Sequence, residues 1–150
     1  MATPFTAGWS TRLQPYAPLM LRLGLGLVFL WSGFSKLVTL PGALGVCTNR
    51  AEAIDFVSTL YWVPFDPEIF VRLQSVLEIG LGLMLVAGLW LEFAAGAVTV
   101  LLLLFFGLFN FNVVWKNLGL VAAAGALWVL PPDRFTLDRY LARHEPKVGE

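Results

Sequence analysis

The chain carries apolar runs that are long enough to cross a lipid bilayer, at about residues 19–40, 69–91 and 93–130. A helix rises about 1.5 Å per residue, so crossing a hydrocarbon core of roughly 30 Å takes about 20 apolar residues. The run from 93 to 130 is too long for one ordinary span and is suited to two. The runs therefore predict an integral membrane protein with four helical spans.

The overall composition agrees with this class of protein. Hydrophobic residues make up 58% of the chain and charged residues 13%, whereas soluble domains carry about 25% charged residues. The formal net charge is zero, so nothing indicates a nucleic-acid partner. Cys47 is the one cysteine, and we interpret it as an ordinary loop residue. A thiol–disulfide relay within this chain alone is disfavoured, because exchange needs a second thiol.

Breaks in the apolar pattern predict an all-α membrane protein, built as a four-helix transmembrane bundle. Pro41-Gly42 closes the first run, Glu92 marks a tight connection, and Pro131-Pro132 ends the last run. Asparagines at 110 and 112 favour a hairpin turn. The expected organisation is an N-terminal tail (1–17), a transmembrane domain (18–131) with spans at about 19–40, 69–91, 93–110 and 113–130, and a charged C-terminal tail (132–150).

The connection between the first two spans contains a predicted amphipathic helix, at about residues 50–61. Asn49 and Glu52 form a capping pair at its start. We expect this helix to lie on the membrane surface, with Tyr61 and Trp62 at the depth of the headgroups. Two roles remain open, since the helix could cover the mouth of an internal site or only cap the bundle.

Glu78 is the most unusual residue of the second span, because it lies near the middle of a hydrocarbon slab. A carboxyl group there costs about 2.5–3.5 kcal/mol, and such groups usually face the bundle interior with a partner. Gln74, Ser75 and Gly82 share its helix face. Two interpretations stay open: Glu78 belongs to a functional site, or it pairs with a neighbouring helix to fix the packing.

A second polar stripe runs along the first span. Arg22, Gly26, Phe29, Gly33 and Lys36 fall on one helix face. The two glycines allow another helix to approach closely. We expect Arg22 to snorkel to the interface rather than take part in a site. For Lys36, snorkelling and membership of a site are both open.

The predicted topology brings charged and amide side chains together in a pocket in the outer half of the bundle. We predict that Glu78 is catalytic and that Lys36, Arg72, Lys116 and Asn117 bind substrate. Glu78 is expected to be buried against Lys36 or Lys116, because Arg72 lies six residues away and is rotated by about 120°. A net positive pocket with amides suits a polar headgroup or a small anion. The spacing does not identify that ligand.

Orientation follows from the lysines and arginines. Four spans place both tails on the same side, and that side holds more of the basic residues flanking the spans. The positive-inside rule then puts both termini in the cytoplasm. The basic residues on that side are Arg12, Arg22, Arg134, Arg139, Arg143 and Lys147.

Three segments carry a resemblance to a known family. They are 22–36 (RLGLGLVFLWSGFSK), 78–88 (EIGLGLMLVAG) and 115–119 (WKNLG). Together with the connector ending at Val63-Pro64, they resemble the DoxX/DoxD family of small four-helix membrane proteins over about residues 18–130. Members are similar to a subunit of a thiosulfate:quinone oxidoreductase of archaeal membranes, and to partners of redox and thiol-handling enzymes.

The resemblance implies a redox-associated membrane subunit, expected in the inner membrane of a prokaryotic cell. Such a subunit would bind quinone, or a small sulfur substrate, and act with a partner redox protein or a larger membrane complex. No haem or metal is expected, because the single histidine, His144, lies in the charged tail. The alternative is a non-catalytic accessory or scaffold subunit. A small-solute carrier is disfavoured, since no inverted repeat or broken helix pair is visible.

Overall fold

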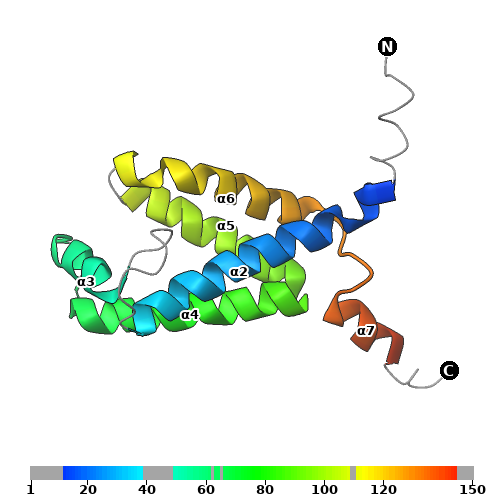
Figure 1. The fold of residues 1–150 in the computed structure, drawn as a ribbon, viewed down its shortest axis with the longest axis horizontal. Coiled ribbons are helices and arrows are strands. Elements are labelled where there is room, and N and C mark those ends of the chain that lie inside the picture. Colours follow the sequence, from blue (N-terminus) through cyan, green and yellow to red (C-terminus); the bar gives the residue numbers. More distant parts are fainter. Residues whose placement is uncertain (1–11, 39–48, 62, 65, 109–110, 145–150) are drawn as a thin grey trace, which may run out of the picture. The chain divides into compact units, whose positions relative to one another are not determined.

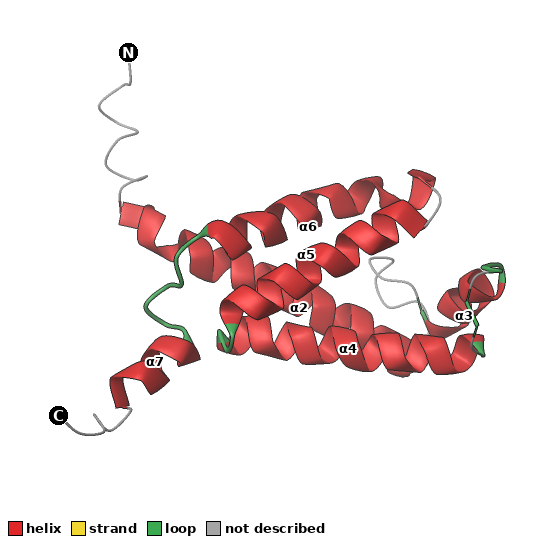
Figure 2. Ribbon diagram, turned by 180° about the vertical axis from the view of Figure 1, so that it is seen from behind, coloured by secondary structure: helices red, strands yellow, loops and turns green. Residues whose placement is uncertain are grey.

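The regular secondary structure of the described residues is all helix, with no strand among them. The computed structural model describes residues 12–38, 49–61, 63–64, 66–108 and 111–144, apart from the side chains of 106–108 and 111–116. The elements are a 3-10 helix, η1 (Gln14–Tyr16), and the α-helices α2 (Ala17–Leu37), α3 (Arg50–Ser58), α4 (Pro67–Ala87), α5 (Leu91–Leu108), α6 (Phe111–Val129) and α7 (Leu137–His144). Figure 1 labels the α-helices, and Figure 2 shows the described loops in green. The expected all-α class is confirmed.

Two helical stretches, Gln14–Leu37 and Pro67–Ala87, are long and apolar enough to cross a membrane. Within the described residues, α5 and α6 carry shorter apolar stretches, Leu91–Phe105 and Asn117–Val129. Large hydrophobic side chains are exposed along these helices, as a lipid-facing surface requires. They include Met20, Leu27, Ile69, Leu73, Val76, Leu83, Val100, Leu103, Leu104 and Leu118. A bundle of four spans stays a prediction.

The chain divides into two compact units. The first, called unit 1, comprises Met1–Leu25 and Met84–Glu150, and the second, unit 2, comprises Gly26–Leu83. Helices α2 and α4 each contribute residues to both units. The two units are described separately below.

In unit 2, glycines let α2 and α4 pack in close contact. A Cβ atom on Gly33 would lie 2.6 Å from the carbonyl oxygen of Ser75, and one on Gly82 would lie 2.9 Å from that of Gly26. Any larger side chain at either glycine would force the two helices apart. The close approach predicted for the glycine stripe of the first span is confirmed.

Helix α3 packs on the beginning of α4 (Figure 1), where Ala53 and Val57 meet Val71. The predicted capping pair is confirmed: the Glu52 N–H donates to Asn49 Oδ1 at 2.9 Å, and the Asn49 N–H donates to Glu52 Oε2 at 3.3 Å.

Helix α3 ends at Ser58, short of the expected residue 61. The hydroxyls of Ser58 and Thr59 bind the carbonyl oxygens of Asp55 and Phe56, at 2.6 and 2.7 Å. Such local bonds compete with continuation of the helix.

In unit 1, α5 and α6 lie side by side in both views (Figure 1, Figure 2). A Cβ atom on Gly96 would lie 3.2 Å from the Trp128 ring, so the beginning of α5 faces the end of α6. Apart from Thr99, the buried residues described in these two helices are small or aliphatic: Leu91, Ala94, Ala95, Val98, Leu102, Ala124 and Leu127.

The connection between α4 and α5 lies earlier than expected. The second span was expected to reach Leu91, whereas α4 ends at Ala87 and Glu92 lies in the first turn of α5. Gly88 has a φ of 67°, and the Leu89 N–H donates to the Met84 carbonyl at 3.0 Å. This is a Schellman end, which glycine favours because it has no Cβ.

Candidate functional site

A buried ion pair joins α2 to α4 inside unit 2. Lys36 Nζ lies 2.6 Å from Glu78 Oε1 and 2.7 Å from Oε2. Both residues are nearly inaccessible to solvent, with 6% of Lys36 and 4% of Glu78 exposed. The prediction that Glu78 is buried against a cation of another helix is confirmed, and Lys36 is that cation. Lys36 therefore does not snorkel to the interface.

Two neighbours complete the hydrogen bonding of the pair. Lys36 Nζ donates to Ser32 Oγ at 3.1 Å, and Gln74 Nε2 donates to Glu78 Oε1 at 2.8 Å. Each neighbour lies one helical turn before the residue it binds, because residues four apart meet on one helix face. The site thus presents an ammonium, a carboxylate, an amide and a hydroxyl within apolar helices.

The expected net positive pocket included three cations, Lys36, Arg72 and Lys116, and the side chain of Lys116 lies outside the described residues. The positive charge of Lys36 is balanced by Glu78, so the cluster that the structure describes is neutral. All three protons of the ammonium have an acceptor, two on the carboxylate and one on Ser32. A charge pair is tolerated away from water when its donors and acceptors have hydrogen-bond partners in this way.

The other predicted site residues are Arg72, Lys116 and Asn117, and of these only Arg72 has a described side chain in unit 2. Arg72 is exposed and binds Glu68 at 2.7 Å, and Glu68 also binds Arg50 of α3. Arg72 therefore belongs to a surface cluster that joins α3 to α4. The side chain of Lys116 lies outside the described residues. Asn117 lies on α6 in unit 1 and is partly exposed.

Cys47 and Asn110 also lie outside the described residues. Among the residues that are described, no group of three or more His, Cys, Asp or Glu is placed to hold a metal ion.

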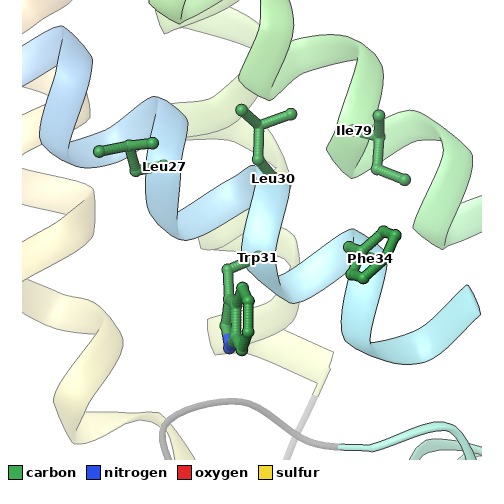
Figure 3. A pocket seen from close by; sticks show the side chains of 5 residues that line it. All are labelled: Leu27, Leu30, Trp31, Phe34 and Ile79. Atoms are coloured by element: carbon green, nitrogen blue, oxygen red, sulfur yellow. The ribbon is translucent and has the colours of Figure 1, made fainter. Parts of the chain in front are cut away.

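An apolar groove of about 280 Å³ lies on the surface of unit 2. Figure 3 shows its lining, which comes from the outer side of α2 and from Ile79 of α4. Every lining residue is apolar, so the groove suits a hydrocarbon chain and not a charged group. The lining residues are Leu27, Leu30, Trp31, Phe34 and Ile79.

Arg22 forms a second buried polar cluster, in unit 1. Its Nε donates to Asp133 Oδ2 at 2.8 Å, and its other nitrogens donate to the carbonyl oxygens of Leu85, Val86 and Phe135. The expectation that Arg22 snorkels is wrong, since only 3% of the residue is exposed. The carbonyls at the end of a helix have no partner within it and carry negative partial charge, so they attract a guanidinium.

The segment that follows Pro131-Pro132 is folded back onto the turn between α4 and α5, although the sequence indicated only a charged tail. Asp138 accepts the N–H groups of Trp90 and Leu91 at 2.9 and 3.1 Å, and it caps the beginning of α5. The signal for this segment was present in the spacing of Leu137, Tyr140 and Leu141, which is that of an amphipathic helix.

The sequence was compared with known families and proteins. A family model described as DoxX matches residues 17–110, which is more than half of the chain. No curated protein and no solved structure matches the chain.

Proposed function

This chain belongs to the DoxX family of membrane proteins, and on that premise we propose that it is a redox-associated membrane subunit. In this proposal the Lys36–Glu78 pair binds a quinone headgroup or a small sulfur substrate, and a partner oxidoreductase supplies or accepts the electrons. The observation that carries the proposal is a buried ammonium–carboxylate pair between two apolar helices. Ionisable residues at such positions mark substrate or proton pathways by default.

The chemistry of the pair fits the headgroup of a quinone. A quinone carbonyl accepts hydrogen bonds, and Lys36 is a donor whose bond to Ser32, at 3.1 Å, is the longest of its three. A carbonyl oxygen could replace the Ser32 hydroxyl without breaking the ion pair. Reduction of a quinone to the quinol takes up two electrons and two protons. The protons would pass through Lys36 and Glu78, and the electrons would come from the partner.

The apolar groove supports the same proposal. Quinones of membranes carry a hydrocarbon tail, and the groove lies on the same two helices as the ion pair. Binding sites for amphiphiles combine a mostly apolar lining with a few placed polar groups.

A non-catalytic scaffold is the second candidate, and one observation favours it. Among the described residues, no buried side-chain nitrogen or oxygen lacks a hydrogen-bond partner. The pair is therefore complete without a ligand. In this role Lys36 and Glu78 would hold α2 on α4, and the subunit would dock a larger membrane complex.

Placement in the membrane is part of the proposal. Residues 18–131 would form four spans with both termini in the cytoplasm, in the inner membrane of a prokaryotic cell. The positive-inside rule supports this orientation.

The test is the quinone content of the purified protein. The wild type, Glu78→Gln, Lys36→Met and Arg72→Gln are purified in mild detergent with any copurifying partner, and are then extracted with organic solvent. Native quinone is expected in the wild type and in Arg72→Gln, a control altered at an exposed arginine, and is expected to be depleted in the other two. If none of the four proteins contained quinone or bound an added analogue, quinone binding would be rejected and the scaffold role would replace it.

A further inference from the structure

Helix α7 exposes an apolar stripe. Leu137, Tyr140 and Leu141 share one face at i, i+3 and i+4 spacing, and they are 37%, 59% and 49% exposed. Phe135, just before the helix, is also exposed. A stripe of this kind on a short helix is typical of elements that lie in a membrane interface.

The opposite side of the same segment is basic. Arg139 and Arg143 are exposed on that side of α7, and Arg134, which precedes the helix, is also exposed. The two acidic residues of the range 133–144 are turned inward. Asp133 is buried against Arg22, and Asp138 caps α5. Because both carboxylates are bound in this way, the outer surface of the segment carries the three arginines.

Unit 1 fixes the beginning of α7 at the end of an apolar helix. The Asp138 N–H donates to the Gly88 carbonyl at 3.2 Å, and the Asp138 carboxylate binds the turn that follows α4. A Cβ on Gly88 would lie 2.9 Å from Thr136 Cα, so the backbones are in close contact. Since α4 is long enough to span a bilayer, this turn belongs at the level of the lipid headgroups.

Exposed aromatic side chains mark the same level. Tyr16 lies before α2, Trp90 lies in the turn between α4 and α5, and Trp128 lies near the end of α6. The rings of Tyr16 and Phe135 stack with their centroids 6.2 Å apart. Tryptophan and tyrosine concentrate at membrane–water interfaces, where an apolar ring body and a polar edge are both accommodated.

We propose that residues 134–144 form a membrane-surface element of this protein, which binds anionic lipid headgroups through Arg134, Arg139 and Arg143. The apolar stripe of α7 enters the headgroup–acyl boundary, and the arginines reach the phosphates beside it. A helix of this length has too little apolar surface to bind a membrane alone. Its attachment to α4 and α5 makes the binding intramolecular, which raises its effective concentration at the lipid.

The experiment places one label on each side of α7 in the full chain. Leu141→Cys and Ala142→Cys are made separately in a Cys47→Ser background and carry the same environment-sensitive fluorophore. Each protein is reconstituted into phosphatidylcholine vesicles with or without phosphatidylglycerol. Quenching is measured with a lipid whose nitroxide lies just below the headgroup, and with iodide in the water. Both positions are exposed, and thermal unfolding checks that the labelled proteins remain folded.

The label at 141 is expected to be quenched several-fold more by the lipid nitroxide than the label at 142, with the reverse order for iodide. Phosphatidylglycerol should increase the difference, and salt or Arg139→Gln with Arg143→Gln should remove that increase. Equal quenching at both positions would overturn the proposal. Protection of position 141 from both quenchers would overturn it too, because a protein partner would then cover the stripe. If quenching at the two positions were the same with and without phosphatidylglycerol, anionic lipid would have no role in the binding.

Discussion

The ammonium of Lys36 lies within 2.7 Å of both carboxylate oxygens of Glu78, and no other ion pair of the described residues joins α2 to α4. The two residues are far apart in the sequence but lie on the facing surfaces of two apolar helices. Their charges cancel within the pair, so removing one partner leaves the other charge buried without compensation.

Removing the carboxylate should therefore destabilise the protein strongly. Glu78→Ala is expected to lower the free energy of unfolding by about 3–5 kcal/mol, the range for a broken buried pair. Glu78→Gln should cost less, because the amide keeps a hydrogen bond to Lys36. The measurement is denaturant unfolding in detergent micelles. Arg72→Gln is the control, and as a surface change it should stay within about 0.5 kcal/mol of the wild type. If Glu78→Ala matched that control, the pair would not hold the helices.

The packing of α2 on α4 should be sensitive to volume at Gly33. Gly33→Ala places a Cβ 2.6 Å from a backbone oxygen, and overpacking of this kind costs about 1–3 kcal/mol. Gly80→Ala is the matched control, because a Cβ there has no neighbour within 4 Å. That control should be neutral or stabilising, since alanine favours helix more than glycine. Thermal unfolding of both variants checks the prediction, and equal melting temperatures would contradict it.

The Arg22 cluster should hold the C-terminal segment in place. Arg22→Met leaves Asp133 buried without its cation, so residues 133–144 are expected to detach and become open to limited proteolysis. Arg134→Gln alters an exposed neighbouring arginine and should leave the protection unchanged. Mass spectrometry of the fragments locates the cleavage. A segment equally resistant in wild type and Arg22→Met would show that other contacts hold it.

The proposed orientation can be tested in intact cells. Phe5→Cys and Glu145→Cys, made one at a time in a Cys47→Ser background, should resist a maleimide that does not cross the membrane. Both should react after the cells are opened. Labelling of both positions from outside would reverse the orientation.

Part of the fold and of the site follows from the sequence because the physical constraints are local. That Glu78 is buried against a lysine could be predicted, since a carboxylate within an apolar run needs a cation, but the sequence left Lys36 and Lys116 as alternatives. The capping box before α3 is also local, with Asn49 and Glu52 three residues apart.

The contacts that were missed depend on the folded chain. Asp133 follows Arg22 by 111 positions, so no helical spacing connects them. Arg72 was grouped with Glu78 because the predicted topology gives only the depth of each residue in the membrane. In the structure, Arg72 binds the carboxylate of Glu68 instead. Gly88 ends α4 through its left-handed backbone, and the sequence does not distinguish it from glycines within helices.

The central claim is that the Lys36–Glu78 pair binds a quinone headgroup, and titration of a soluble quinone analogue into the purified protein tests it most directly. Wild type is compared with the reversed pair, Lys36→Glu with Glu78→Lys, which keeps an ion pair between the helices but moves the ammonium away from Ser32. The account predicts saturable binding by the wild type. It predicts affinity weaker by about tenfold or more in a reversed pair that still folds, as expected for one lost hydrogen bond to a charged group. Unchanged affinity in the reversed pair, or no saturable binding by the wild type with its copurifying partner, would contradict the claim.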